Sequence, residues 1–371
     1  MSKYILVTGG AGYIGSHTTL ALLKAGHKVV VVDNLCNSYK ESVQRVQTLA
    51  QCAPNDLIFI EASVNDKTAL EVIFGKYNID AVIHFAGLKS VSESINHPLH
   101  YYHNNVTATC VLLECMEAHG CNKIVFSSSA TVYGNATQPY IKETYPTSPL
   151  TPYGRSKLMC EEVIIDTCNS SNLSAVILRY FNPVGCHESG MIGENPRNGP
   201  NNLMPCVTAA MSSEMPMNVF GSDYKTDDGT AIRDFIHVVD LADGHVAALN
   251  KLISVNAKGK REHTFCEIYN MGNGTGSSVK EVIHTMEEAT GVTVPYKIVG
   301  RRPGDAECVV ADPAKAFCEL DWRPKLLLVD MCRTAWNWQK QNPDGYAVNE
   351  EKLESTERLV DKLWKLFVGR S

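Results

Sequence analysis

The chain has 371 residues, enough for a large α/β domain together with a smaller one. Its formal net charge of -6 leaves no excess of basic residues, which argues against a nucleic-acid partner. No apolar run is long enough to span a bilayer, so we expect no membrane association.

The first forty residues contain a dinucleotide-binding pattern. An apolar run over 4–8 leads into a G-x-x-G-x-x-G motif formed by Gly9, Gly12 and Gly15, and a helical pattern covers 13–24. These glycines permit a tight turn, a close approach of backbone to a pyrophosphate, and close packing of helix on strand. Asp33 ends the next apolar run, where a carboxylate can bind a ribose 2'-hydroxyl and would repel a 2'-phosphate. The pattern therefore predicts NAD rather than NADP.

Strand and helix patterns alternate through the first half of the chain. We expect strands at 4–8, 28–33, 57–61, 81–85, 123–128 and 175–180, and helices at 13–24, 67–77, 104–118 and 152–168. This alternation predicts an α/β fold with a Rossmann-type, doubly wound parallel sheet. Sheets of this kind bind ligands beyond the carboxyl ends of their strands.

The composition changes near residue 182, where Gly, Pro and Asn become frequent and no second glycine fingerprint follows. We therefore expect an NAD-binding Rossmann domain over residues 1–182. A smaller C-terminal α/β domain over 183–371 is expected to bind the substrate. The apolar segments near 235–239 and 267–271 are expected to return to the first sheet.

The segment Thr151–Lys157 carries the residues suited to catalysis. Thr151 is a good helix N-cap and proline is favoured at the first helical position, so Tyr153 and Lys157 share one helix face. A nearby ammonium favours the phenolate of a tyrosine, whose reference pKa is about 10. Tyr153 is thus a candidate general base for a sugar or alcohol hydroxyl, and Ser129 can bridge to the same oxygen. A Tyr–Lys pair alone is a common surface feature; the preceding dinucleotide pattern favours the catalytic interpretation.

Several motifs resemble the extended short-chain dehydrogenase/reductases: residues 8–15, 127–134, 153–157 and 179–185. Within that group, six segments closely resemble the UDP-glucose 4-epimerase family: residues 33–38, 84–89, 180–185, 200–205, 233–238 and 301–305. The resemblance runs from residue 3 to about residue 345. It implies interconversion of UDP-glucose and UDP-galactose through a 4-keto sugar, with tightly held NAD, a role in galactose metabolism and a homodimer.

The same resemblance assigns roles to individual residues. The catalytic set is Tyr153, Lys157 and Ser129. The cofactor set is Gly9, Gly12, Tyr13, Ile14, Gly15, Asp33, Asn34, Asn37, Ser38, Ser63, Val64, Phe85, Ala86, Gly87, Lys89, Asn104, Ser127, Tyr153, Lys157, Tyr180 and Phe181. The substrate set is Lys89, Ser129, Tyr153, Phe181, Asn182, Asn202, Leu203, Asn218, Phe220, Arg233, Arg302, Asp305 and Val309.

Two positions depart from the family pattern. Ala62-Ser63-Val64 follows the third strand, where relatives usually place an aspartate that contacts adenine. Val309 stands where some relatives carry a bulky aromatic residue and reject N-acetylated sugars. A smaller side chain there leads us to expect room for UDP-GlcNAc and UDP-GalNAc.

The cysteines bear on the cellular compartment. No two of the 13 form a C-x-x-C pair, and no secretory signal precedes the first strand. We therefore expect reduced thiols, no metal site and a cytoplasmic protein.

Two other functions share part of this pattern. A sugar-nucleotide dehydratase or decarboxylase would use the same fold, cofactor and Tyr–Lys pair. Relatives that eliminate water usually carry acidic residues just after the serine or threonine at the strand end, where this chain has Ala130-Thr131-Val132. A non-catalytic dinucleotide sensor is the second alternative, but loss of Tyr153 or Lys157 would be its signature, and both are present.

Overall fold

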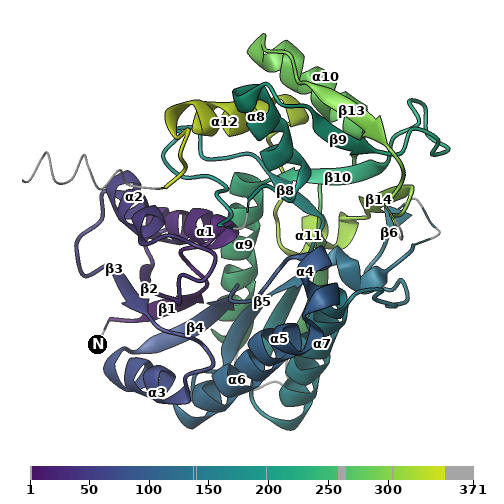
Figure 1. Ribbon diagram of the computed structural model, residues 1–371. Coiled ribbons are helices and arrows are strands. Elements are labelled where there is room, and N and C mark those ends of the chain that lie inside the picture. Colours follow the sequence, from purple (N-terminus) through teal and green to yellow (C-terminus); the bar gives the residue numbers. More distant parts are fainter. Residues whose placement is uncertain are drawn as a thin grey trace, which may run out of the picture.

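The computed structural model describes residues 2–136, 138, 140–197, 199–257, 265–302 and 305–346. Its polypeptide forms two lobes (Figure 1). The larger lobe holds a seven-stranded sheet between two layers of helices. The smaller lobe combines two short sheets with helices α8 (Leu203–Ser213), α10 (Val279–Thr290) and α12 (Leu328–Gln341) from the C-terminal half.

The large sheet has the strand order β11-β7-β5-β4-β1-β2-β3, and all of its strand pairs are parallel. Its strands are β1 (Tyr4–Thr8), β2 (Lys28–Asp33), β3 (Leu57–Glu61), β4 (Ile79–His84), β5 (Lys123–Ser129), β7 (Ser174–Tyr180) and β11 (Cys266–Met271). The central strands are continuous apolar runs because both of their faces are buried.

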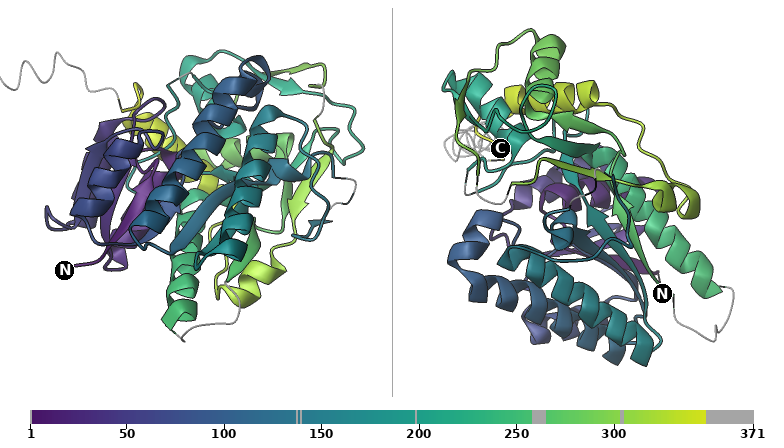
Figure 2. Two further views of the ribbon diagram at one scale, coloured as in Figure 1. Left: turned by 90° about the horizontal axis from the view of Figure 1, so that it is seen from below. Right: turned by 90° about the vertical axis from the view of Figure 1, so that its right-hand side faces the viewer.

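Helices cover both faces of this sheet, as the right-hand view of Figure 2 shows. One layer consists of α1 (Tyr13–Lys24), α2 (Lys40–Ala50) and α9 (Val238–Ala257), which pack on one another and enclose one apolar core. The other consists of α3 (Lys67–Lys76), α6 (Ala108–Ala118) and α7 (Pro152–Ser170), which enclose a second. The order of the strands, with β1 between β2 and β4, places the topological switch point at the glycine loop.

The smaller lobe is built around β10 (Ile232–His237), which pairs with β8 (Asn182–Val184), β12 (Gly276–Ser278) and β14 (Cys308–Ala311). Strand β14 also pairs with β6 (Tyr140–Ile141), and a separate pair is formed by β9 (Met217–Phe220) and β13 (Tyr296–Val299). The helices of this lobe are α8, α10 and α12, whereas α11 (Ala314–Glu319) packs against β11 of the large sheet. A third apolar core lies among α8, α10 and α12.

Short helical segments follow β4. They are α4 (Val91–Asn96), α5 (Pro98–Tyr101) and a π-helical turn, Tyr102–Thr107, that leads into α6. The Asn105 side chain accepts a hydrogen bond from Leu88 N (2.8 Å) and donates to Leu88 O (3.1 Å) and Ser156 Oγ (3.0 Å). These bonds tie the wide turn to the end of β4 and to α7.

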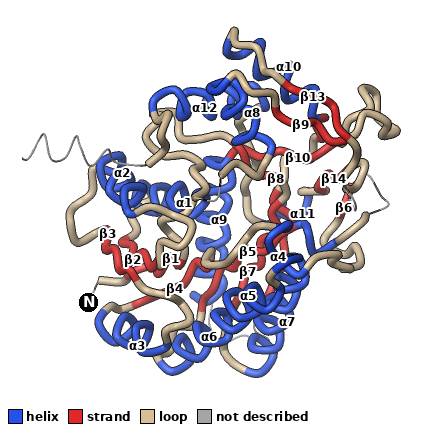
Figure 3. Tube along the Cα trace, in the orientation of Figure 1, coloured by secondary structure: helices blue, strands red, loops and turns tan. Residues whose placement is uncertain are grey.

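Most expected elements of the first half are confirmed (Figure 3). Strands 4–8, 28–33 and 57–61 and helix 13–24 match residue for residue. The expected helix over 104–118 is wrong at its start, since its first turn is π-helical. Helix α2 was not expected.

The two returning segments differ in their outcome. Strand β11 pairs with β7 at the edge of the large sheet. The expectation for 235–239 needs correction, because Phe235–His237 pair with β8 and α9 begins at Val238. The return to the larger lobe is made by α9, which packs against α1, β5 and β7. No helix in the described part of the chain is long and apolar enough to cross a membrane.

Candidate active site

The glycine loop joins β1 to α1 at the carboxyl edge of the large sheet. Gly9 has φ +69°, and a Cβ there would lie 2.7 Å from Ala86 N, so only glycine fits. A Cβ on Gly15 would lie 2.2 Å from Gly9 O, which shows how closely α1 approaches the turn. Helix α1 begins without a side-chain cap, so Tyr13 and Ile14 stand at an uncapped N-terminus suited to a phosphate.

Asp33 organises the turn that follows β2. Its Oδ2 accepts a hydrogen bond from Ala11 N (3.0 Å) in the glycine loop. Its Oδ1 accepts bonds from Leu35 N (2.9 Å) and Ser38 Oγ (2.8 Å). The carboxylate thus links the glycine loop to the turn that carries Asn34, Asn37 and Ser38.

The turns after β3 and β4 complete this edge. Ser63 Oγ accepts a bond from Asn65 N (3.3 Å), so the serine caps its own turn, and Val64 is buried in the apolar core. The Phe85 ring lies 4.8 Å from the His245 ring, and Ala86 N donates to Thr8 Oγ1 (3.4 Å). Asn104 Nδ2 donates to Asn105 Oδ1 (3.3 Å) in the π-helical turn.

Tyr153, Lys157 and Ser129 meet where β5 and α7 converge. Thr151 caps α7 by accepting a bond from Gly154 N (3.3 Å), which fixes the first turn of the helix. Tyr153 is buried beside Ser129, whose side chain acts to lower the pKa of the phenol. Lys157 Nζ donates to Ser127 O (2.6 Å) and lies 3.7 Å from the position a Cβ would take on Gly87. The structure therefore brings the catalytic set together beside the end of β4.

The electrostatics of the pair differ in one respect from the expectation. Burial raises the pKa of Tyr153, and the Ser129 side chain partly lowers it. Burial also lowers the pKa of Lys157 to about 8. The lysine nitrogen donates to a backbone carbonyl rather than to the phenol, and Ser129 rather than Lys157 opposes the rise in the pKa of Tyr153.

His245, which sequence reasoning missed, contacts Tyr180 at the end of β7. The Tyr180 hydroxyl and His245 Nε2, both buried, share a short hydrogen bond. His245 Nδ1 is bonded to Leu241 O (2.8 Å) in the preceding turn of α9. Through Tyr180, helix α9 thus supports the end of β7, next to the end of β5 that holds Lys157. Phe181 is buried beside Tyr180.

The expected substrate residues gather in the smaller lobe. Arg233 Nη2 lies 3.4 Å from Asp305 Oδ1, and Arg233 is the register partner of Val309 between β10 and β14. The Arg302 guanidinium stacks 3.8 Å from the centroid of the Phe220 ring. Two arginines, one carboxylate and one aromatic ring are thus arranged in two neighbouring pairs.

The remaining expected residues are more dispersed. Lys89 Nζ forms an ion pair with Glu194 Oε1 (2.9 Å), and Asn202 Nδ2 donates to the same oxygen (3.0 Å). Leu203 begins α8 and packs on the third core. Asn182 lies in β8, and Asn218 is exposed on β9.

A buried ion pair between Arg179 and Glu161 contacts Ser128, the residue before Ser129. No local sequence pattern predicts this pair. Arg179 Nη2 and Nε bond to the two Glu161 oxygens at 2.6 and 3.0 Å. Ser128 Oγ forms a short hydrogen bond with Glu161, and Arg179 Nη1 donates to the Tyr133 hydroxyl (3.0 Å). The pair joins α7, β5 and β7, and both of its side chains are almost fully buried.

A parallel sheet with this glycine loop, and a buried Tyr-x-x-x-Lys pair beside a serine, define an extended short-chain dehydrogenase/reductase. A profile of the family described as GDP-mannose 4,6 dehydratase matches residues 6–335. The UDP-glucose 4-epimerase of Homo sapiens is 51% identical over 355 residues, covering 93% of this chain and 99% of that protein.

Solved structures agree. The UDP-glucose 4-epimerase of Bifidobacterium longum, in complex with NAD+ and UDP, is 44% identical with a TM-score of 0.85 and covers 93% of this chain and all of that one. The UDP-Glc/GlcNAc 4-epimerase of Campylobacter jejuni is 37% identical with a TM-score of 0.77, covering 92% of this chain and 100% of that one. The chain belongs to the UDP-glucose 4-epimerase family.

Proposed function

We propose that this protein is an NAD-dependent isomerase that interconverts UDP-glucose and UDP-galactose by inverting C4 of the hexose. The observation that carries the proposal is the burial of Tyr153, Ser129 and Lys157 together at the carboxyl edge of the sheet, with Lys157 anchored on the Ser127 carbonyl. The family membership supports the same activity.

The residues at the sheet edge fit NAD. The crowded Gly9 and Gly15 positions leave backbone rather than side chains around the uncapped start of α1, which suits a pyrophosphate. Asp33 is a carboxylate at the end of β2, where the adenosine ribose of a dinucleotide is held. Tyr13, Asn37, Ser38, Phe85 and Lys89 would surround the rest of the cofactor.

The proposed chemistry needs one base and one redox partner. Bound NAD+ would supply the acceptor and donor of the C4 hydride, and the positive charge of its ring would favour the tyrosinate. Tyr153 accepts the proton of the 4-hydroxyl at its phenol oxygen and gives it back after the 4-keto sugar has turned. Ser129 holds the same sugar oxygen. Lys157, anchored on the Ser127 carbonyl, supplies a fixed positive charge at this edge.

The substrate nucleotide is held through charge and stacking. Guanidinium groups bind phosphate oxygens in a bidentate manner, which suits Arg233 and Arg302 to a diphosphate. Phe220 and Leu203 offer apolar surface for uracil, and Asp305 can accept bonds from ribose hydroxyls. A firm hold on UDP leaves the hexose free to present either face to the same base.

The dehydratase alternative is disfavoured by the residues after Ser129. Water elimination needs a further acid–base group, and the segment 130–132 carries no carboxylate. In the structure Ser129 Oγ accepts bonds from Thr131 N (3.2 Å) and Thr131 Oγ1 (2.9 Å). The group next to Ser129 is therefore a hydroxyl, which cannot serve as a carboxylic acid would.

Two further properties belong to the proposal. A homodimer is supported by the large exposed side chains of Ile95, Leu99 and Met159 on α4, α5 and α7. Light scattering on the purified protein measures its mass directly, and a monomer at micromolar concentration would exclude the dimer. A cytoplasmic location is supported by the cysteines of the described residues, none of which forms a disulfide bond. Fractionation of cells tests it, and recovery in a secreted fraction would exclude it.

The activity is tested on wild type and Tyr153→Phe. Denaturing the wild type should release NAD, and the holoenzyme should convert UDP-galactose to UDP-glucose without net NADH. Removing the phenol hydroxyl should lower kcat by about 10²- to 10⁴-fold, the range typical of acid–base groups, while NAD stays bound. A Tyr153→Phe protein that keeps a tenth of the wild-type rate would contradict the assignment.

A further inference from the structure

Residues 185–197 cross the carboxyl edge of the large sheet, and we call them the strap. The strap contacts three loops that the proposed function assigns to NAD. The Tyr13 hydroxyl donates to Gly185 O (2.5 Å) at the start of α1. Arg197 N donates to Asn37 Oδ1 (3.2 Å) after β2, and Glu194 binds Lys89 after β4. The strap therefore bridges the ends of β1, β2 and β4.

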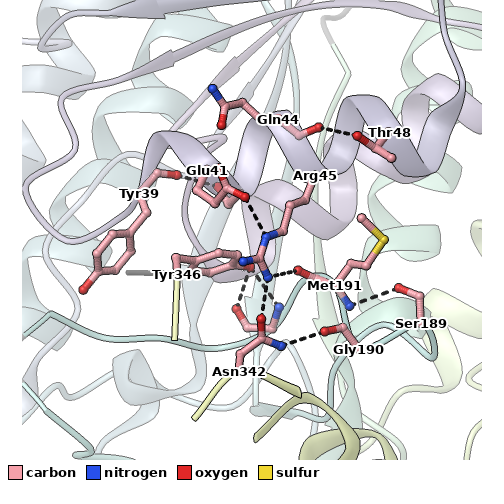
Figure 4. A network of polar contacts seen from close by, with 12 residues as sticks. Tyr39, Glu41, Gln44, Arg45, Thr48, Ser189, Gly190, Met191, Asn342 and Tyr346 are labelled. Carbon is pink, nitrogen blue, oxygen red and sulfur yellow. Dashed lines mark hydrogen bonds and ion pairs between the residues drawn. The ribbon is translucent and has the colours of Figure 1, made fainter. Parts of the chain in front are cut away.

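The middle of the strap is fastened by Arg45 of α2 (Figure 4). Arg45 Nη1 donates to Met191 O (3.0 Å) in the strap and to Asn342 Oδ1 (2.6 Å) just after α12. Its Nε donates to Glu41 Oε1 (2.9 Å), which fixes the direction of the guanidinium. Asn342 Nδ2 in turn donates to Gly190 O (2.8 Å), so the strap is held at two adjacent carbonyls.

Aromatic rings close the other side of this junction. The Arg45 guanidinium lies 5.1 Å from the centroid of the Tyr346 ring and 5.8 Å from that of Trp338. The Tyr346 hydroxyl accepts a bond from Gly193 N (2.9 Å) and donates to Gly193 O (3.2 Å). Because Trp338 and Tyr346 are buried, the arginine works in a partly dehydrated setting where its bonds are strong.

We propose that Arg45 is a positioning residue that holds the strap closed over the dinucleotide and so slows its release. The inference rests on the proposed function, in which the cofactor is regenerated at every cycle and need not leave. Arg45 acts through Met191, Asn342 and Tyr346. The strap can open only when these contacts break, so the rate of NAD release depends on them.

The test is the rate at which unlabelled NAD displaces labelled NAD from the holoenzyme. Arg45→Gln removes the charge and the bond to Met191 O, and we expect release to become at least about tenfold faster. Tyr346→Phe keeps the ring and loses both bonds to Gly193, and we expect a smaller increase. Arg333→Gln is the matched control on α12, because Arg333 is exposed and pairs only with nearby Asp330 among the described contacts.

Faster release should lower the turnover of Arg45→Gln in the absence of free NAD, and added NAD should restore it. The melting temperature of the NAD-free variant should stay near that of the NAD-free wild type. Release rates of both variants within twofold of wild type would overturn the inference and leave the proposed function standing. The inference also fails if Arg333→Gln speeds release as much as Arg45→Gln. If Arg45→Gln does not fold, Tyr346→Phe decides. A wild type without bound NAD would overturn the proposed function as well.

Discussion

At the residue scale, the site depends on where Lys157 points as much as on Tyr153. The lysine nitrogen donates to Ser127 O, and burial lowers its pKa to about 8. A lysine with that pKa is still mostly protonated at neutral pH, so it supplies positive charge beside the dinucleotide edge. The sequence places Lys157 on the correct helix face, but the carbonyl that anchors it belongs to another strand.

At the same scale, we predict that Val309 limits the size of the sugar that the site accepts. It is the register partner of Arg233 between β14 and β10, and Arg233 belongs to the expected substrate set. We expect Val309→Tyr to lower the ratio of kcat/KM for UDP-GalNAc to that for UDP-galactose by about tenfold or more, because the larger ring fills the space of the N-acetyl group. Coupled assays with both sugars measure the ratio.

Val309→Ala is the control for this change, since a smaller side chain should keep the wild-type ratio. Wild-type protein that does not epimerise UDP-GalNAc at all would end the idea of a pocket wide enough for an N-acetyl group.

At the element scale, α7 is fixed to the sheet through the buried Glu161–Arg179 pair. Removing one partner of a buried pair leaves the other charge unpaired and costs about 3–5 kcal/mol. We therefore expect Glu161→Gln to lower the free energy of unfolding in urea by about that amount. Because Glu161 lies on the helix that presents Tyr153 and Lys157, kcat should fall too.

Glu114→Gln provides the comparison, because Glu114 pairs with Lys67 on the surface with both side chains more than half exposed. That variant should change stability by less than about 1 kcal/mol. Equal losses in the two variants would show that the buried pair contributes no more than a surface pair.

The elements that sequence reasoning placed correctly are those with local signals. The glycine loop, the apolar runs of β1, β2 and β3, and the Thr-Pro start of α7 are each recognisable within a few residues. Helix α2 was missed although Val43 and Val46 carry its buried face. Strand β10 was placed in the wrong sheet, because a short apolar run does not show which strand it pairs with.

The site shows the same division. Tyr153, Lys157, Ser129 and the glycines follow from motif and spacing, and their roles in binding remain predictions. His245, Glu161, Glu194 and Arg45 act through partners 18 to 297 positions away in the sequence, and no local pattern marks them. Such contacts become visible only once the chain is folded.

At the scale of the whole molecule, buried histidines make stability depend on pH. Burial lowers the pKa of His17 and His84 to about 3 and that of His237 and His245 to about 4. Below the unfolded-state pKa of about 6.5, the unfolded chain binds protons that the folded protein excludes. The free energy of unfolding should therefore fall as pH drops from about 6.5 towards 4.

Each histidine contributes up to about 1.4 kcal/mol per pH unit over this range. Asp234 opposes the trend, because burial raises its pKa to about 6 and protonation there favours the folded state. Urea unfolding at pH 7.5, 6.5 and 5.5 measures the slope. His284→Gln, at an exposed position on α10, should leave the slope unchanged. A flat profile between pH 6.5 and 5.5 would contradict this prediction.

The edge position of β11 has a consequence for how such proteins can be recombined. Strand β7 is paired along its outer edge with β11, and in the sequence β11 comes after β8, β9 and β10 of the smaller lobe. A fragment ending at residue 182 would present the hydrogen-bonding edge of β7 to other molecules and lack α9 over one apolar face, so it should aggregate. We therefore expect a chimaera of two relatives to fold only if its Rossmann half also contains residues 238–257 and 266–271 of the same relative.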